Sequence, residues 1–313
     1  VYAKSDEFWE ENRFEKLNKD EVGIYKMLDT LKTVKKFKQM YNLVSILGSG
    51  YINYKKFDYG PIFSTFGFNE VEGIRVRVGG RTYFGPNDKW RLQGYSAYGF
   101  DDNKFKYGMS GKWMVDKKNR IIISGGNRRD VEQIGVSLTT TNDVLGRSFA
   151  SSSLLSSGSN GKLTNINLSN VAVEMEAAKN FIIGTGLSYR TLESASDVFS
   201  LDYYTTLPSP ANPNGVVEGT VVQSEASIQV EYTPNRRPIA FGVERSIASS
   251  PYSTFFVNYS QGYKGVINSD FNYQKLQVYL KQPIIIGPLG RTNLILEAGK
   301  TFGTIPLGLL SVI

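Results

Sequence analysis

The feature that most constrains this chain is a two-residue alternation of apolar and polar side chains, which begins near residue 58. In the clearest stretch, from Val222 to Tyr232, apolar or small residues occupy every even position, and Gln, Glu or Ser occupies every odd one. Successive side chains of a β-strand point to opposite faces of the sheet, so this period indicates strands with one apolar and one polar face. We therefore predict an all-β fold.

The same alternation predicts about 12 strands. Pro61 precedes the first of them, at a position where a strand tolerates proline. The predicted strands are 62–68, 73–83, 89–100, 104–116, 119–128, 164–177, 180–192, 222–232, 236–246, 252–260, 269–282 and 291–301.

The alternation also indicates which solvent surrounds the sheet. The chain has 19 Tyr, 18 Phe and 31 Gly, yet its mean hydropathy is only −0.26. No stretch approaches 18 consecutive apolar residues, which excludes a transmembrane helix. Transmembrane barrel strands alternate apolar and polar residues and carry aromatic girdles, so hydropathy averages hide them. We predict an antiparallel transmembrane β-barrel.

One hairpin provides a register for this prediction. If 101–104 is a four-residue loop, Phe100 faces Phe105, Tyr98 faces Tyr107 and Leu92 faces Trp113, so both apolar sets share one side of the sheet. Aromatic residues then gather at both ends of the pair, as in a girdle. We predict that the membrane-facing aromatic side chains are Trp90, Tyr98, Phe100, Phe105, Tyr107, Trp113 and Tyr232.

Two long connections, about 130–163 and 193–216, are rich in Ser, Thr and Asn. Long loops of outer-membrane barrels face outward and short turns face the periplasm, so an even number of strands must separate these two. The pair 164–177 and 180–192 satisfies this rule. With periplasmic helices, an odd number of strands must precede residue 130, and strand 62–68 is the required fifth.

The residues that the chain lacks restrict its chemistry. It has no Cys, which excludes disulfides and thiolate metal sites, and no His, which excludes His-based triads and imidazole ligands. We predict no catalytic, metal-binding or cofactor-binding residue and no enzyme activity. The net charge of +7 comes without a dense Lys/Arg arm, so we expect no nucleic-acid partner.

A basic cluster lies on two adjacent predicted strands and comprises Arg75, Arg77, Arg81 and Arg91. This cluster could make the barrel lumen favour anions, or it could form the surface to which a plug segment binds. We favour a simpler interpretation, in which these residues face the lumen and pair with carboxylates of neighbouring strands.

Residues 1–57 are predicted to form a periplasmic helical segment or plug, ahead of a barrel at 58–313. Asn18 and Glu21 resemble a capping box, and apolar residues then recur at helical spacing through 20–47 until Gly48 and Gly50. A shorter helix is expected at 6–14. Lysines concentrated in the longer helix leave a membrane-surface anchor open as an alternative. The start at Val1 and the apolar end at Ile313 suggest the ordered part of a longer protein with further strands.

Several stretches resemble one family, the large outer-membrane proteins of the Bacteroidetes type, which carry an N-terminal carboxypeptidase-like regulatory domain and a C-terminal domain of unknown function. The resemblance rests on 8–13, 57–61, 71–82, 98–100, 105–108, 271–276 and 298–303. It implies a β-barrel loosely similar to barrel-assembly and translocation-assembly proteins, and it supplies no catalytic residues.

The leading hypothesis is therefore a non-enzymatic protein of the cell outer membrane that acts in envelope biogenesis, outer-membrane protein assembly or export. An accessory subunit of a larger outer-membrane complex is one alternative, and a soluble all-β binding protein is another. The expected partners are outer-membrane lipid and other envelope proteins, which would bind residues 1–48 and the loops 130–163 and 193–216.

Overall fold

The computed structural model describes residues 8, 11–12, 18–85, 87–133, 163–238, 242–244 and 252–310. The chain divides into two compact units, Val1–Tyr51 and Ile52–Ile313, and we describe each by itself.

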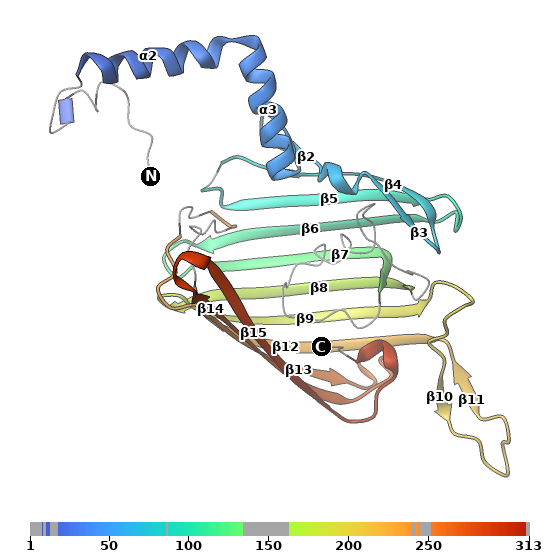
Figure 1. The fold of residues 1–313 in the computed structure, drawn as a ribbon. Helices are drawn as coiled ribbons and strands as arrows, with labels where there is room; N and C mark the ends of the chain where they lie inside the picture. Colours follow the sequence, from blue (N-terminus) through green and yellow to red (C-terminus); the bar gives the residue numbers. More distant parts are fainter. Residues whose placement is uncertain are drawn as a thin grey trace. The chain divides into compact units, whose positions relative to one another are not determined.

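The first unit holds α2 (Lys19–Thr33) and α3 (Lys35–Ser49), drawn in blue in Figure 1. The capping box is present: the Asn18 side chain accepts from the Glu21 backbone N–H at 2.8 Å, and Glu21 accepts from that of Asn18 at 2.8 Å. Gly50, at φ 76°, ends α3 in the left-handed conformation that glycine adopts without strain. No helix in these described residues is long and apolar enough to cross a membrane.

The sequence predicted one helix over 20–47, and the structure contains two. Val34 is extended, at φ −67° and ψ 119°, and separates α2 from α3. The β-branched pair Thr33–Val34 favours such a break, because both residues lose side-chain freedom in a helix. The predicted helix at 6–14 lies largely outside the described residues.

The second unit is dominated by one antiparallel sheet of 13 strands, shown in Figure 1. Twelve of them follow the order β1-β2-β4-β5-β6-β7-β8-β9-β12-β13-β14-β15, β3 also pairs with β4, and β10 pairs with β11 in a separate hairpin. The strands are β1 (Ile52–Tyr54), β2 (Phe57–Tyr59), β3 (Phe66–Asn69), β4 (Gly73–Thr82), β5 (Trp90–Gly99), β6 (Phe105–Asp116), β7 (Ile121–Gln133), β8 (Leu163–Ala178), β9 (Phe181–Ser194), β10 (Tyr203–Thr206), β11 (Val216–Glu218), β12 (Thr220–Tyr232), β13 (Thr254–Tyr263), β14 (Tyr273–Ile285) and β15 (Arg291–Phe302).

The fold is thus all-β with few helices, as predicted. The sheet is open in the described residues, because β1 and β15 are its two ends and do not pair with each other.

The strand predicted at 62–68 is a longer, interrupted one. β2 pairs with the end of β4, and β3 pairs with its beginning. Between them lie a cis Gly60–Pro61 peptide bond and the 3₁₀ turn Ile62–Ser64, so Pro61 marks the interruption rather than a strand start. Proline has no N–H for the ladder, which explains why pairing stops there.

The β5–β6 register differs from the prediction by two residues. Tyr98 faces Phe105, Ser96 faces Tyr107 and Trp90 faces Trp113, so six residues, 99–104, lie between the last two paired residues rather than four. A shift of two leaves each side chain on its predicted face, because the strand period is also two.

The strand predicted at 236–246 is wrong for the residues of it that are described. Residues 236–238 and 242–244 form no strand. Val243 instead packs against Met114 and Ile122. Val243 fits the apolar–polar alternation of the sequence, but its side chain is buried against these two residues and does not lie on the face of a strand. We call residues 242–244 the strap.

The connections between strands define two ends of the sheet. The strap end carries the connections 83–89, 117–120, 179–180 and 233–253. The loop end carries 70–72, 100–104, 134–162 and 195–219, including both connections that the sequence marked as long. A hydrophobic cluster of Ile166, Leu192, Leu201, Val221, Tyr273 and Leu309 joins β8, β9, β12 and β14 to residues near the end of the described chain.

Candidate functional site

Burial in the sheet is inverted relative to a soluble protein. Arg75 on β4 is 0% exposed, whereas its neighbours Ile74 and Val78 are exposed. The same inversion recurs on β5 and β6, where Arg91 and Lys106 are buried. We call the face that carries Arg75 the inward face and the opposite face the outward face. The candidate site is the set of buried charges on the inward face.

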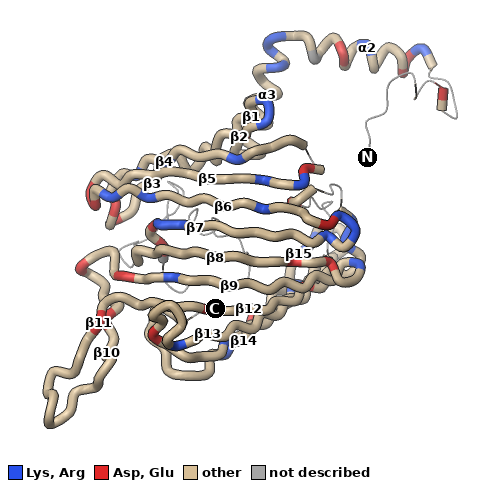
Figure 2. Tube along the Cα trace, turned by 180° about the vertical axis from the view of Figure 1, so that it is seen from behind, with Lys and Arg blue, Asp and Glu red and all other residues tan. Residues whose placement is uncertain are grey.

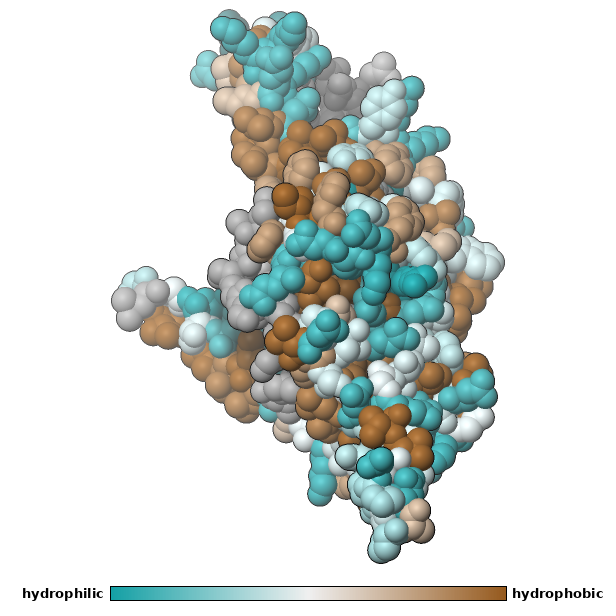
Figure 3. Space-filling model, turned by 90° about the vertical axis from the view of Figure 1, so that its right-hand side faces the viewer, coloured by the Kyte–Doolittle hydropathy of each residue, from teal (hydrophilic) through white to brown (hydrophobic). Residues whose placement is uncertain are grey.

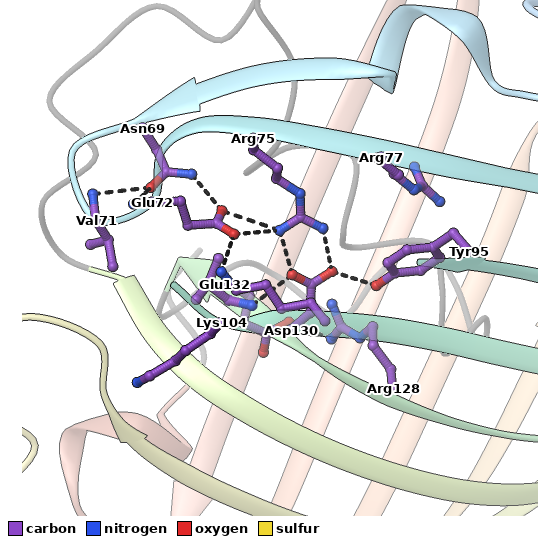
Figure 4. Close-up of polar contacts among 12 residues, drawn as sticks. Asn69, Val71, Glu72, Arg75, Arg77, Tyr95, Lys104, Arg128, Asp130 and Glu132 are labelled. Carbon is purple, nitrogen blue, oxygen red and sulfur yellow. Dashed lines mark hydrogen bonds and ion pairs between the residues drawn. The ribbon is translucent and has the colours of Figure 1, made fainter. Parts of the chain in front are cut away.

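Arg75 is the centre of this set (Figure 4). Its guanidinium holds Asp130 in a fork, with Nη1–Oδ1 at 2.6 Å and Nη2–Oδ2 at 2.9 Å, and it also donates to Glu72 at 3.0 Å. Two parallel bonds to a carboxylate fix direction as well as distance. Asp130 also accepts from the Tyr95 hydroxyl. Because β4 and β7 are not neighbours in the sheet, this contact requires the sheet to curve.

Charges around this pair continue to the loop end. Lys106 lies 2.5 Å from both Glu72 and Asp102. Asn69 donates to Glu72 at 2.6 Å. Isolated buried charges are costly, whereas paired and hydrogen-bonded ones are tolerated. Figure 3, which views this end, shows hydrophilic side chains gathered across its centre.

Three further arginines of the inward face also have polar or acidic partners. Arg128 pairs with Glu132 at 2.6 Å. Arg77 donates to the Ser64 hydroxyl at 2.8 Å, and its guanidinium lies 4.0 Å from the centre of the Tyr95 ring. Arg81 pairs with Asp58 at 3.1 Å and is half-buried.

A second cluster lies on β9, β12 and β14. Arg190 pairs with Glu225 at 3.2 Å, and Glu225 accepts from the Tyr273 hydroxyl. Lys275 donates to the backbone carbonyl of Leu309 at 2.8 Å. The chain after β15 is therefore held on the inward face by both a hydrogen bond and the hydrophobic cluster around Leu309.

The strap contacts the ends of β5, β6 and β7 at the strap end of the sheet. The Val243 backbone N–H donates to the Asp88 carbonyl at 2.7 Å, and Arg120 donates to the Gly242 carbonyl at 3.1 Å. Glu244 forms ion pairs with Arg91 and, at 3.7 Å, with Lys112. The connection between β12 and β13 therefore reaches the ends of β5, β6 and β7 across the inward side.

The outward face has the opposite chemistry. The seven aromatic residues singled out from the sequence are all exposed, by 36% to 60% of their surface. Trp90 faces Trp113 near the strap end, and Tyr98 faces Phe105 near the loop end. Figure 2 shows long uncharged stretches along β8 and β9. Exposed apolar side chains recur along the outward faces of β4, β5, β6 and β8, and large contiguous apolar patches are uncommon on soluble monomers.

The four arginines predicted to face the lumen lie on the inward face, and each of them has a polar or acidic partner there. The sequence reasoning missed those partners, above all Asp130, and it missed the strap. Arg128, Asp130 and Glu132 do repeat at the strand period, which is a signal that could have added β7 to the basic cluster.

The long loop predicted at 130–163 begins later than expected, because β7 runs to Gln133; residues 134–162 lie outside the described residues. The loop predicted at 193–216 begins within the last two residues of β9, contains β10 and ends at the first residue of β11. Tyr203 donates to Glu218 at 3.0 Å. Burial raises the pKa of the Tyr203 phenol, and the hydrogen bond to Glu218 adds to the rise. The protonated phenol donates this bond from β10 to the last residue of β11, in addition to the backbone pairing of the two strands.

Within the described residues there is no group of His, Cys, Asp or Glu side chains suited to a metal ion. Glu72, Asp130 and Glu225 of the inward face are already engaged by arginine, lysine or tyrosine. Chemically, these pairs neutralise the buried charges of the inward face and hold their side chains in fixed positions.

Comparison with known proteins gives a family and similar solved structures. Residues 43–304 match the model described as "Family of unknown function (DUF5686) C-terminal domain". No curated protein matches. Among solved structures, the crystal structure of BamA from Haemophilus ducreyi lacking POTRA domains 1-3 is similar at 12% identity with a TM-score of 0.42. The match covers 80% of this chain and 42% of that one, so the chain spans less than half of that structure.

Proposed function

The chain belongs to the family of unknown function DUF5686, as its C-terminal domain, and from that premise we propose that it is an integral outer-membrane protein whose 13-stranded sheet forms the wall of a transmembrane β-barrel. The observation that carries this proposal is the inverted burial of the sheet, with charged side chains inside and apolar ones outside.

The physical reason is that the two faces need different surroundings. In water, the outward face would expose Trp, Phe, Ile and Val side chains on nearly every strand, at a cost of about 25 cal/mol for each Å². In lipid, an uncovered inward face would expose charged groups that hydrocarbon cannot solvate. A sheet curved around its charges, with lipid outside, satisfies both faces.

The proposal extends to location and role. We place the protein in the outer membrane of a Gram-negative bacterium, because β-sheet walls of this kind are typical of that membrane. We also propose that it acts without enzymatic chemistry in envelope biogenesis, in the assembly or export of outer-membrane proteins. We further propose that the protein is of the Bacteroidetes type and that its full-length form carries an N-terminal carboxypeptidase-like regulatory domain.

A labelling experiment tests the membrane wall. The chain has no cysteine, so a single cysteine introduced along β6 is the only one in each variant and can be labelled selectively with a fluorophore. In phospholipid vesicles, lipid-borne quenchers are expected to quench labels at Tyr107, Met109 and Trp113 but not at the inward Ser110 and Lys112. Quenching without a two-residue period, or release of the protein from membranes by carbonate alone, would contradict the proposal.

A second experiment tests the role. Depletion of the protein in its native cell is expected to lower the amount of other outer-membrane barrels. Sizing the particle in mild detergent distinguishes the alternatives, since a single-chain mass disfavours an accessory subunit. Unchanged barrel levels after depletion would remove the assembly role while leaving the membrane wall intact.

A further inference from the structure

We propose that α3 lies on the surface of an anionic phospholipid bilayer, with its apolar stripe in the lipid and its lysines at the headgroups. The inference rests on the proposed membrane sheet and adds a binding surface outside it.

The first observation is an apolar stripe on α3 without a covering element in the described residues. Met40, Tyr41, Val44 and Leu47 recur at helical spacing, and all are exposed. No residue of α3 is buried. A helix with such a stripe is stabilised when the stripe is buried against another phase, because a short isolated helix is marginal in water.

The second observation is the charge around the stripe. Between Thr30 and Tyr51 the chain has no Asp or Glu, and its charged residues are Lys32, Lys35, Lys36 and Lys38. An amphipathic helix with lysines beside the stripe is typical of helices that lie in the interface of an anionic bilayer. The same charge disfavours a second copy of α3 as the occupant, because two such helices would repel each other.

The third observation is the length of the tether. Only Gly50 and Tyr51 separate α3 from β1, and two residues span at most about 7 Å. If the sheet crosses a membrane, α3 is held close to that membrane whatever its direction. Because the helix is tethered to the sheet, its binding to the bilayer is intramolecular, and most of the entropic cost of bringing it to the surface is already met.

The test uses the full chain in phosphatidylcholine vesicles with or without phosphatidylglycerol. A fluorophore on Val44→Cys is expected to be quenched by lipid-borne quenchers when phosphatidylglycerol is present. A fluorophore on Asn42→Cys, on the opposite side of α3, is expected to be quenched by aqueous iodide. Replacing Lys35, Lys36 and Lys38 with Gln should shift the partition of α3 toward water roughly a hundred-fold. The matched control, Lys117→Gln with Lys118→Gln in the β6–β7 turn, should leave it unchanged.

A label on Met109→Cys, on the outward face of β6, separates this inference from the proposed function. If the label at position 109 is quenched by lipid while the label at position 44 is quenched by iodide in both vesicle compositions, the proposal that α3 lies on the bilayer is wrong, and the proposed membrane sheet is unaffected. Iodide quenching at both positions would overturn the membrane sheet as well. Protection of Val44 in detergent, with cross-linking between two chains, would assign the stripe to a second copy and also overturn the inference.

Discussion

At the scale of the residue, Arg75 shows why the charges of the inward face depend on one another. Its fork on Asp130 and its bond to Glu72 leave both carboxylates compensated. If one partner is removed, the other remains as a buried, uncompensated charge, which costs more than the pair contributes. The intact network therefore adds little to the free energy of unfolding, but the loss of any one of its members destabilises the sheet.

Asp130→Leu is expected to lower the free energy of unfolding by about 3–5 kcal/mol, because Arg75 loses its principal partner. The double variant with Arg75→Met should lose less than the sum of the two single variants, because neither charge then remains. Urea unfolding in phospholipid vesicles measures all three. Additive losses would show that the two side chains do not act as a pair.

Gly262→Ala is expected to destabilise the sheet by about 1–3 kcal/mol, as overpacking does. A Cβ at Gly262 would lie 2.4 Å from a ring carbon of Tyr273, on the neighbouring strand. The ring would have to move, and with it the bond that Tyr273 donates to Glu225. The same unfolding measurement tests this, with Gly23→Ala in α2 as the control, since no atom lies within 4 Å of that position.

The sequence predicted which arginines share one face of the sheet, but it did not identify the residues that pair with them. The strand period alone places Arg75 and Arg91 opposite the apolar face. Arg75 and Asp130, however, lie 55 positions apart on strands that are not neighbours in the sheet. Their contact depends on how strongly the sheet curves, and alternation carries no information about curvature.

At the scale of the element, the strands were more predictable than their connections. The period of two identifies a strand and its faces, and it tolerated a two-residue error in the β5–β6 register. It failed at 236–246, where an apolar residue serves the interior instead of a strand. It also gave no sign of the interruption between β2 and β3, which arises from one proline and a 3₁₀ turn.

Met109→Lys, on the outward face of β6, is expected to cost about 2–4 kcal/mol in a bilayer, since Met109 lies midway along a strand that we place in lipid. Leu207→Lys is the matched control, because Leu207 is also exposed and apolar but lies beyond the sheet, next to β10. It should cost close to nothing. Unfolding in vesicles compares the two variants, and equal costs would argue against lipid at β6.

At the scale of the whole molecule, the strap relates distant parts of the sheet. It joins the β12–β13 connection to the ends of β5, β6 and β7. In the sheet order, β8 and β9 lie between β7 and β12, so this contact links parts of the sheet that do not pair with each other.

Cysteines at Met114 and Val243 are expected to form a disulfide on mild oxidation, since the two side chains pack together. The cross-linked chain should migrate faster on a denaturing gel. Val115 is the control partner for Val243, because it points to the outward face of β6 and should not react. Equal cross-linking at 114 and 115 would mean that the strap does not lie on the inward side.

The strap has a consequence for the order of events when the chain folds. Most pairings in the sheet form hairpins between strands that are close along the chain, so they need little loop closure. The Arg91–Glu244 pair instead joins residues 153 positions apart. Such a loop closes favourably only after the hairpins inside it have formed. The contact between the strap and the ends of β5, β6 and β7 should therefore form late during folding, and it can break while the strands themselves stay paired.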